Sequence, residues 1–228
     1  MVPNIYEVKG VIFDLGDTLI AHSPEVDEDK EFSRILDRPR EFIEFQSLQI
    51  CRNFVSIATE EFVTRLAAAA GVSDASAISA MMEAVHRSVV GSKLQHDAQR
   101  CLSSLRKRGM RLCLISNTNP VSWNRLRHHG LEEAFDEIIF SCDVGLYKPD
   151  PRIFELAFKR LDLQPGEVCA VGDKVRTIVL GVAHLGTRTV LLERRAKGPV
   201  SSGALVVDAM VSNLDELLAI PWLGGSSC

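Results

Sequence analysis

After about residue 92 the chain alternates short apolar runs with longer amphipathic stretches. Apolar runs that are rich in β-branched residues and end at polar or turn-forming residues are typical of buried strands. These runs predict strands at residues 10–13, 112–115, 137–140, 168–171, 188–191 and 209–211. Helical spacing predicts helices at residues 95–108, 122–126, 153–161, 177–185 and 213–218. This alternation predicts an α/β fold with a doubly wound parallel sheet.

Between residues 20 and 91 the pattern changes, and it predicts several helices without strands. Mainly apolar positions are spaced there for a helical face, at Phe42, Phe45, Leu48 and the polar Gln49 and again at Phe54, Ile57, Ala58, Phe62, Leu66 and Ala69. We expect this stripe to form the core of a helical bundle. The sequence therefore predicts an α/β core of residues 1–20 and 92–228 that is interrupted by an inserted helical part, residues 21–91.

The apolar run in VKGVIFDLGDTL, residues 8–19, stops abruptly at Asp14. Ligands of open α/β sheets bind in the crevice beyond the carboxyl ends of the strands. Asp14 is therefore a candidate nucleophile or metal ligand. The same pattern of a strand followed by Asp and Gly also occurs as an ordinary turn, so this motif alone leaves both interpretations open.

Three later segments end in side chains that suit phosphate chemistry. RLCLISN (111–117) ends at Ser116 and Asn117, YKPDP (147–151) contains Lys148, and VCAVGD (168–173) ends at Asp173. A carboxylate such as Asp14 can be phosphorylated and then hydrolysed, which divides one difficult displacement into two easier ones. Phosphoryl transfer mainly needs positioning and neutralisation of the phosphate oxygens, which a hydroxyl, a lysine and Mg²⁺ can provide.

In this order and context the residues resemble the haloacid dehalogenase superfamily of aspartate-nucleophile hydrolases, particularly its phosphatases with a small helical cap. The resemblance extends from residue 8 to about residue 218. It implies that Asp14 is the nucleophile, and that Ser116, Asn117 and Lys148 bind and neutralise the phosphate. The inserted helical part has the position and size of the cap that this resemblance implies.

The resemblance also implies a magnesium site at the same edge of the sheet. Mg²⁺ prefers carboxylate, carbonyl and water oxygens in an octahedral array. Asp14, the carbonyl oxygen of Gly16 and Asp173 would provide three of these ligands. The implied reaction is the hydrolysis of a small phosphorylated metabolite through a phospho-aspartyl intermediate.

Two positions depart from the pattern of the family. Most family phosphatases have a second Asp two residues after the nucleophile as general acid and base, and this chain has Gly16 there. General acid–base assistance typically contributes about 10²- to 10⁴-fold, so we expect slow turnover unless Asp17 substitutes. Ile178 stands where family members often have an acidic residue, which predicts weaker binding of Mg²⁺. Lys174 is expected to point to solvent, as most lysines do.

Three classes of function remain open on these residues. The first is a Mg²⁺-dependent phosphatase, and the second is a hydrolase of another bond, a dehalogenase or a phosphonate hydrolase. Gly172 and Asp173 favour a metal enzyme over the metal-independent dehalogenase, whereas a phosphonate hydrolase would need a Schiff-base lysine in the cap, where Lys30 is the only lysine. The third class is a catalytically impaired binding or regulatory protein, which Gly16 and Ile178 favour.

Composition narrows the cellular setting. A net charge of −4 gives no general attraction to nucleic acid or to an anionic membrane, so we expect neither as a partner. Neither a signal peptide nor an apolar stretch of spanning length is recognisable, which predicts a cytoplasmic protein. The six cysteines lack metal-binding spacing, and free buried thiols are expected.

Overall fold

The central element of the fold is a sheet of six parallel strands. The computed structural model describes residues 7–21, 26–182, 184–194 and 207–224. Within them the strand order is β5-β4-β1-β6-β7-β8, with bounds of Gly10–Phe13 for β1, Arg111–Ser116 for β4, Glu137–Phe140 for β5, Val168–Gly172 for β6, Arg188–Leu192 for β7 and Ala209–Val211 for β8. Every predicted strand is confirmed to within one residue at each end. The reason is that parallel strands covered on both faces need continuous apolar runs, which the sequence shows directly.

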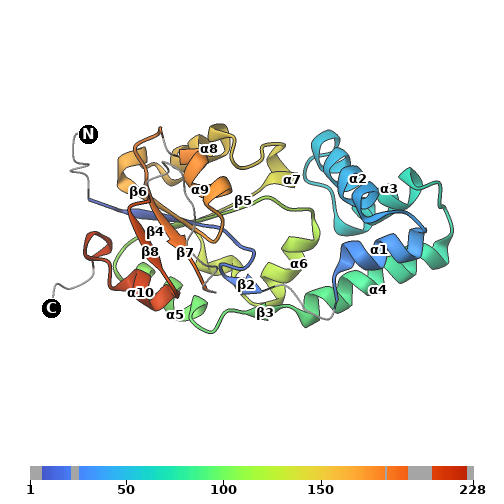
Figure 1. Cartoon of the computed structure of the whole chain (residues 1–228), viewed down its shortest axis with the longest axis horizontal. Coiled ribbons are helices and arrows are strands. Elements are labelled where there is room, and N and C mark those ends of the chain that lie inside the picture. Colours follow the sequence, from blue (N-terminus) through green and yellow to red (C-terminus); the bar gives the residue numbers. More distant parts are fainter. Residues whose placement is uncertain (1–6, 22–25, 183, 195–206, 225–228) are drawn as a thin grey trace.

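Helices cover both faces of this sheet, as the doubly wound arrangement requires (Figure 1). Successive side chains of a strand point to opposite faces, so Ile12 of β1 packs with one layer of helices while Val11 and Phe13 pack with the other. The first layer is α8 (Pro151–Leu161) and α9 (Val175–Val182). The second layer comprises α5 (Ala98–Lys107), α6 (Val121–His128) and α10 (Leu214–Leu218).

Four further helices form a separate group beside the α/β part, which we call the helical segment (Figure 1). They are α1 (Glu28–Leu36), α2 (Arg40–Asn53), α3 (Thr59–Ala69) and α4 (Ala75–Gly91). Asp27 and Asp74 begin α1 and α4 by accepting hydrogen bonds from backbone N–H groups of the first turn. In the α/β part, α6 contacts α4, and the short helix α7 (Ser141–Val144) contacts α2.

The predicted apolar stripe of the helical segment is only partly confirmed. Phe62 and Leu66 are fully buried in the core, but Phe45 and Phe54 are 57% and 40% exposed. The prediction that Phe54 lies on the same helical face as Phe62 and Leu66 was wrong. α2 ends at Asn53 and α3 begins only at Thr59, so Phe54 lies on neither helix. Its ring instead stacks against the guanidinium of Arg65, 3.7 Å from the ring centroid.

A short antiparallel pair joins the two ends of the helical segment. β2 (Ile20–Ala21) precedes the segment and β3 (Lys93–Leu94) follows it, and the two strands are hydrogen-bonded. Sequence patterns did not predict them, since two residues carry no readable alternation. The pairing keeps the start of the segment close to the loop that follows Asp14.

The cysteines behave as predicted wherever they are described. Cys51, Cys101, Cys113, Cys142 and Cys169 are free and buried, and Cys228 lies outside the described residues. Burial raises the pKa of Cys51 and of Cys101 to about 12, which disfavours the nucleophilic thiolate form. Among the described residues, no helix combines the length and apolar character needed to cross a membrane.

Candidate active site

The carboxyl ends of β4, β1 and β6 meet at one edge of the sheet. Ser116 is the last residue of β4, Asp14 follows β1, and Asp173 follows β6. The backbone N–H of Asp14 donates to the carbonyl oxygen of Val171 at 3.0 Å, which fixes the end of β1 against β6. The chain passes from β1 to β4 on one side of the sheet and from β6 to β7 on the other, so β1 and β6 form a switch point, where open α/β sheets bind ligands.

Asp14 and Lys148 form a buried ion pair at this edge. Lys148 Nζ lies 2.6 Å from Asp14 Oδ1 and also donates to the carbonyl oxygen of Ile115 at 2.7 Å. Asp14 Oδ1 accepts a second hydrogen bond from the backbone N–H of Leu15 at 2.9 Å. The residues Asp14 and Lys148 are only 7% and 4% exposed. The carboxylate is thus fixed in one orientation next to a desolvated cation.

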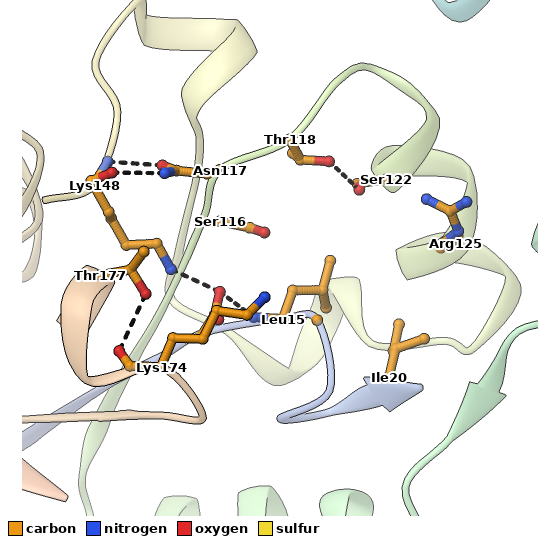
Figure 2. A pocket seen from close by; sticks show the side chains of 12 residues that line it. Leu15, Ile20, Ser116, Asn117, Thr118, Ser122, Arg125, Lys148, Lys174 and Thr177 are labelled. Atoms are coloured by element: carbon orange, nitrogen blue, oxygen red, sulfur yellow. Dashed lines mark hydrogen bonds and ion pairs between the residues drawn. The ribbon is translucent and has the colours of Figure 1, made fainter. Parts of the chain in front are cut away.

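Asn117, the residue that follows β4, fixes the backbone of Lys148. Its side-chain Nδ2 donates to the carbonyl oxygen of Lys148, and its Oδ1 accepts from the backbone N–H of Lys148, both at 2.7 Å. Figure 2 shows this double hydrogen bond, and it shows the hydroxyl of Ser116 directed into the cavity. Four of the residues singled out from the sequence, Asp14, Ser116, Asn117 and Lys148, therefore lie together.

A cavity of about 130 Å³ opens above these residues. It is small beside the roughly 300–1,000 Å³ of typical drug-sized ligand sites, so it suits a phosphoryl group with a short organic chain. Its lining also includes Leu15, Gly16, Ile20, Thr118, Ser122, Arg125, Lys174 and Thr177.

Asp173 lines a second cavity, whereas its neighbour Lys174 lines the first. Asp17 and Arg194 line that second cavity with it. Burial raises the pKa of Asp173, the nearby Lys174 opposes this, and the negative charges of Asp14 and Asp17 add to it. Asp173 Oδ1 is buried and has no hydrogen-bond partner. A buried carboxylate oxygen without a partner is costly, and a bound cation would satisfy it.

The donor set at this edge fits a magnesium ion. No three His, Cys, Asp or Glu side chains of the described residues are arranged to hold a metal ion. Mg²⁺, however, is commonly held by one or two carboxylates together with waters. Asp14 and Asp173 are close enough to interact electrostatically, and the carbonyl oxygen of Gly16 belongs to the same turn, so these three groups could hold the ion.

Ile178 does not lie where the spacing had suggested. It is 1% exposed and belongs to the apolar core beneath α9. A Cβ on residue 172 would lie 2.5 Å from Ile178 Cγ1, which explains why Gly172 ends β6. The residue of α9 that does line the cavity is Thr177, four positions after Asp173. Thr177 was missed because its position depends on where α9 begins.

Asp17 was considered as a substitute acid for the missing carboxyl group at Gly16. Asp17 has a φ of 57°, an uncommon left-handed conformation for a residue with a side chain, and it lines the second cavity beside Asp173. Gly16, in contrast, lines the first cavity beside Asp14. This placement argues against proton donation by Asp17 in the first cavity.

Four further polar residues of the lining, Thr118, Ser122, Arg125 and Lys174, were not identified as site residues from the sequence. Ser122 and Arg125 are one turn apart on α6 and both face the cavity, and the hydroxyls of Ser122 and Thr118 are hydrogen-bonded to each other. Lys174 is exposed, as expected, yet it also lines the cavity (Figure 2). The spacing of Ser122 and Arg125 was the only signal, and it is common to many surface helices.

Several curated proteins are similar to parts of this chain, and two of them show the range of their activities. Glyceraldehyde 3-phosphate phosphatase from Methanothermobacter thermautotrophicus is 33% identical over 124 residues, which cover 51% of this chain and 55% of that protein. (S)-2-haloacid dehalogenase 1 from a Pseudomonas species is 36% identical over 99 residues, which cover 43% of each protein. The matched stretches therefore span about half the length of these relatives.

A solved structure and a family model each match a larger part of the chain. The crystal structure of a HAD phosphatase from Thermococcus onnurineus superimposes with a TM-score of 0.67 and 23% identity, over 97% of this chain and all of that one. The model of haloacid dehalogenase-like hydrolases matches residues 8–185. The chain belongs to the haloacid dehalogenase-like hydrolase family.

Proposed function

We propose that this protein is a Mg²⁺-dependent phosphatase that hydrolyses a small phosphorylated metabolite through a phospho-aspartyl intermediate on Asp14, in the cytoplasm. The observation that carries the proposal is the buried ion pair of Asp14 and Lys148 beside the inward-facing hydroxyl of Ser116. Similarity to a glyceraldehyde 3-phosphate phosphatase supports a phosphorylated metabolite as substrate.

In the first step a carboxylate oxygen of Asp14 attacks phosphorus, and the bond from phosphorus to the ester oxygen breaks. In the second step water attacks the aspartyl phosphate, which releases inorganic phosphate and restores Asp14. Ser116 and Lys148 face the non-bridging oxygens, where donors and a cation stabilise the transferring group. Magnesium, held by Asp14, Asp173 and the carbonyl oxygen of Gly16, would add positive charge at the same oxygens.

We further propose that residues 21–91 act as a cap over this edge of the sheet and that the α/β core comprises residues 1–20 and 92–228. α4 contacts α6, which carries two residues of the cavity lining, so the helical segment lies against the site. A cap in this position limits the access of water during the formation of the aspartyl phosphate.

The competing classes are less well supported. The unpartnered oxygen of Asp173 favours a site with a bound cation, which a metal-independent dehalogenase does not need. Lys30, the lysine that a phosphonate hydrolase would need, is exposed on α1 and outside the cavity lining. Gly16 still favours slow turnover, and a binding protein is the outcome if no ester is hydrolysed.

Phosphate release from p-nitrophenyl phosphate and from a panel of phosphorylated metabolites, with Mg²⁺ and with EDTA, tests the proposal. We expect turnover that needs Mg²⁺ and is lost in Asp14→Asn. Asp162→Asn is the matched control, because Asp162 is an exposed aspartate at the end of α8. Activity that persists in Asp14→Asn would contradict the covalent mechanism, and absence of Mg²⁺-dependent turnover in the natural protein would contradict the phosphatase.

A further inference from the structure

Arg125 is a buried cation in the cavity lining that the phosphatase mechanism does not use. It is 5% exposed and lies on α6, on the side of the cavity nearest the helical segment. Its Nη2 donates to Glu28 of α1 and to Ser88 Oγ of α4, the latter at 3.2 Å. Its Nε is buried without a hydrogen-bond partner. The guanidinium therefore retains unused donor capacity at the edge of the cavity.

The three cations of the cavity lining differ in their ion-pair partners and in their positions. Lys148 is paired with Asp14, the nucleophile, and Lys174 is exposed near the start of α9, on the same side as Asp173. Arg125 comes from α6 instead, and its counter-ion Glu28 is supplied by the helical segment rather than by the cavity lining. A phosphoryl group on Asp14 would be served by Lys148 and Ser116, which leaves Arg125 to face the organic part of the substrate.

The chemistry of Arg125 selects one kind of group. A guanidinium presents its N–H donors in a planar fork that matches a carboxylate in bidentate geometry. Leaving a donor of a buried charged group unpaired is costly, and an arriving carboxylate would remove that cost. The neighbouring hydroxyls of Ser122 and Thr118 suit a polar chain between the phosphate and the carboxylate.

We propose that Arg125 binds a carboxylate of the substrate, which would make the substrate a short phosphomonoester of a carboxylic acid. This inference rests on the proposed phosphatase function and narrows its substrate class. Glu28 is paired with Arg125 when substrate is absent, and it competes with the incoming carboxylate for the guanidinium. The small volume of the cavity restricts the chain between the two anionic groups to a few atoms.

Matched pairs of phosphomonoesters that differ by a carboxylate test the inference. The pairs are 3-phosphoglycerate with glycerol 3-phosphate, phosphoserine with phosphoethanolamine, and phosphoglycolate with 2-hydroxyethyl phosphate. For at least one pair we expect Arg125→Gln to lower kcat/KM of the carboxylated member by about 10- to 100-fold, mainly through KM, since a hydrogen bond to a charged group is lost. The other member should change less than about threefold.

Glu28→Gln separates recognition from a structural role of Arg125. Removal of the competing charge should lower KM for the carboxylated ester, whereas a merely structural ion pair would make both variants worse for both esters. Arg127→Gln is the matched control, because Arg127 lies on the same helix but is exposed and paired with Glu132. It should leave the preference unchanged.

Calorimetry can measure the binding of the same pairs of esters to Asp14→Asn. This variant is expected not to turn them over, so the test does not depend on turnover. If Asp14→Asn binds the carboxylated member of a pair more tightly than the other member, and the double variant Asp14→Asn/Arg125→Gln does not, the inference is supported even if no ester is hydrolysed. If p-nitrophenyl phosphate is hydrolysed but neither kinetics nor calorimetry shows a carboxylate preference in any pair, the inference is wrong and the phosphatase stands. A preference that is unchanged in Arg125→Gln also overturns it.

Discussion

Lys148 Nζ lies 2.6 Å from Asp14 Oδ1 with both residues buried, whereas Lys174 lines the same cavity from an exposed position. Removing one partner of a buried ion pair leaves the other charge without compensation, which typically costs about 3–5 kcal/mol. We therefore predict that Lys148→Met lowers the free energy of unfolding by that amount, as measured by urea denaturation. Lys174→Met should change it by less than about 0.5 kcal/mol, as is usual for exposed positions.

Lys174→Met should nevertheless affect the substrate, because Lys174 lines the same cavity as Lys148. Lys174→Met should remain fully folded and raise KM for phosphate esters, since an exposed cation at the cavity attracts the anionic substrate. Equal loss of stability in the two variants would show that the ion pair of Asp14 and Lys148 contributes no more than a surface charge.

Thr177 and Ile178 provide a second contrast, this time for metal binding. Thr177, four positions after Asp173, lines the first cavity, whereas Ile178 is buried in the apolar core. Thr177→Asp should tighten Mg²⁺ by about 10- to 100-fold, the range typical of groups that support metal ligands. Ile178→Asp should instead destabilise the protein by more than about 3 kcal/mol, because it buries a charge among apolar side chains.

Calorimetric titration of Mg²⁺, together with urea denaturation, distinguishes the two positions. Thr177→Asn is the matched control, since it keeps a polar side chain without the charge and should tighten Mg²⁺ less. Tighter Mg²⁺ binding by a stable Ile178→Asp protein would restore the original interpretation of the spacing.

The strands and the order of the site residues were readable from the sequence for a physical reason. Strands of a doubly wound sheet are buried on both faces, so each is a continuous apolar run, and the ligand edge begins where the run stops at a polar residue. Asp14, Ser116 and Asp173 were found in this way. The ion pair of Asp14 with Lys148, which lies 134 positions further along the chain, depends on the loop before α8 and required the folded chain.

The helical residues of the site were not readable to the same extent. α9 begins at Val175, two residues earlier than its apolar pattern predicted, and the facing of Thr177 and Ile178 depends on this helical phase. On α6, Arg125 and Arg127 are two positions apart and look equivalent in sequence, yet one is buried in the cavity wall and the other is exposed. A single sequence does not reveal which side of a short helix meets the rest of the protein.

Asp29 should make stability depend on pH. Burial raises the pKa of Asp29 from its ordinary value of 3.8 to about 6, the charges of Glu28 and Asp27 add to this, and Arg40 opposes it. Because the pKa is raised in the folded state, the stabilising contribution is fully present below about pH 4 and is lost as the pH rises through 6. By pH 8 the loss approaches about 3 kcal/mol.

Asp29→Asn removes this dependence. The variant should be more stable than the natural protein at pH 8, and the difference should vanish at pH 4, as measured by urea denaturation across this range. Glu28→Gln should lower the pKa of Asp29 and shift the transition to lower pH, since it removes a neighbouring negative charge. Parallel stability curves for Asp29→Asn and the natural protein would contradict the assignment.

Gly16 has the clearest chemical consequence for catalysis. It lines the cavity beside Asp14, and without a carboxyl group there the leaving alkoxide must depart unprotonated or take its proton from water or the substrate. Esters with good leaving groups need little protonation, so aryl phosphates and sugar 1-phosphates should react faster than simple alkyl phosphates. We predict a steep dependence of kcat/KM on the pKa of the leaving group in the natural protein.

Gly16→Asp should flatten that dependence and accelerate alkyl esters by up to about 10²-fold, because a positioned acid can protonate the leaving oxygen in the transition state. Gly16 is not among the positive-φ glycines of the described chain, so its backbone does not have the left-handed conformation that disfavours a side chain. Gly16→Asn is the matched control, since its amide has a similar size but cannot supply the proton. A series of aryl and alkyl phosphates measured with all three proteins decides the matter: equal slopes would mean that another group, such as Asp17, already protonates the leaving oxygen.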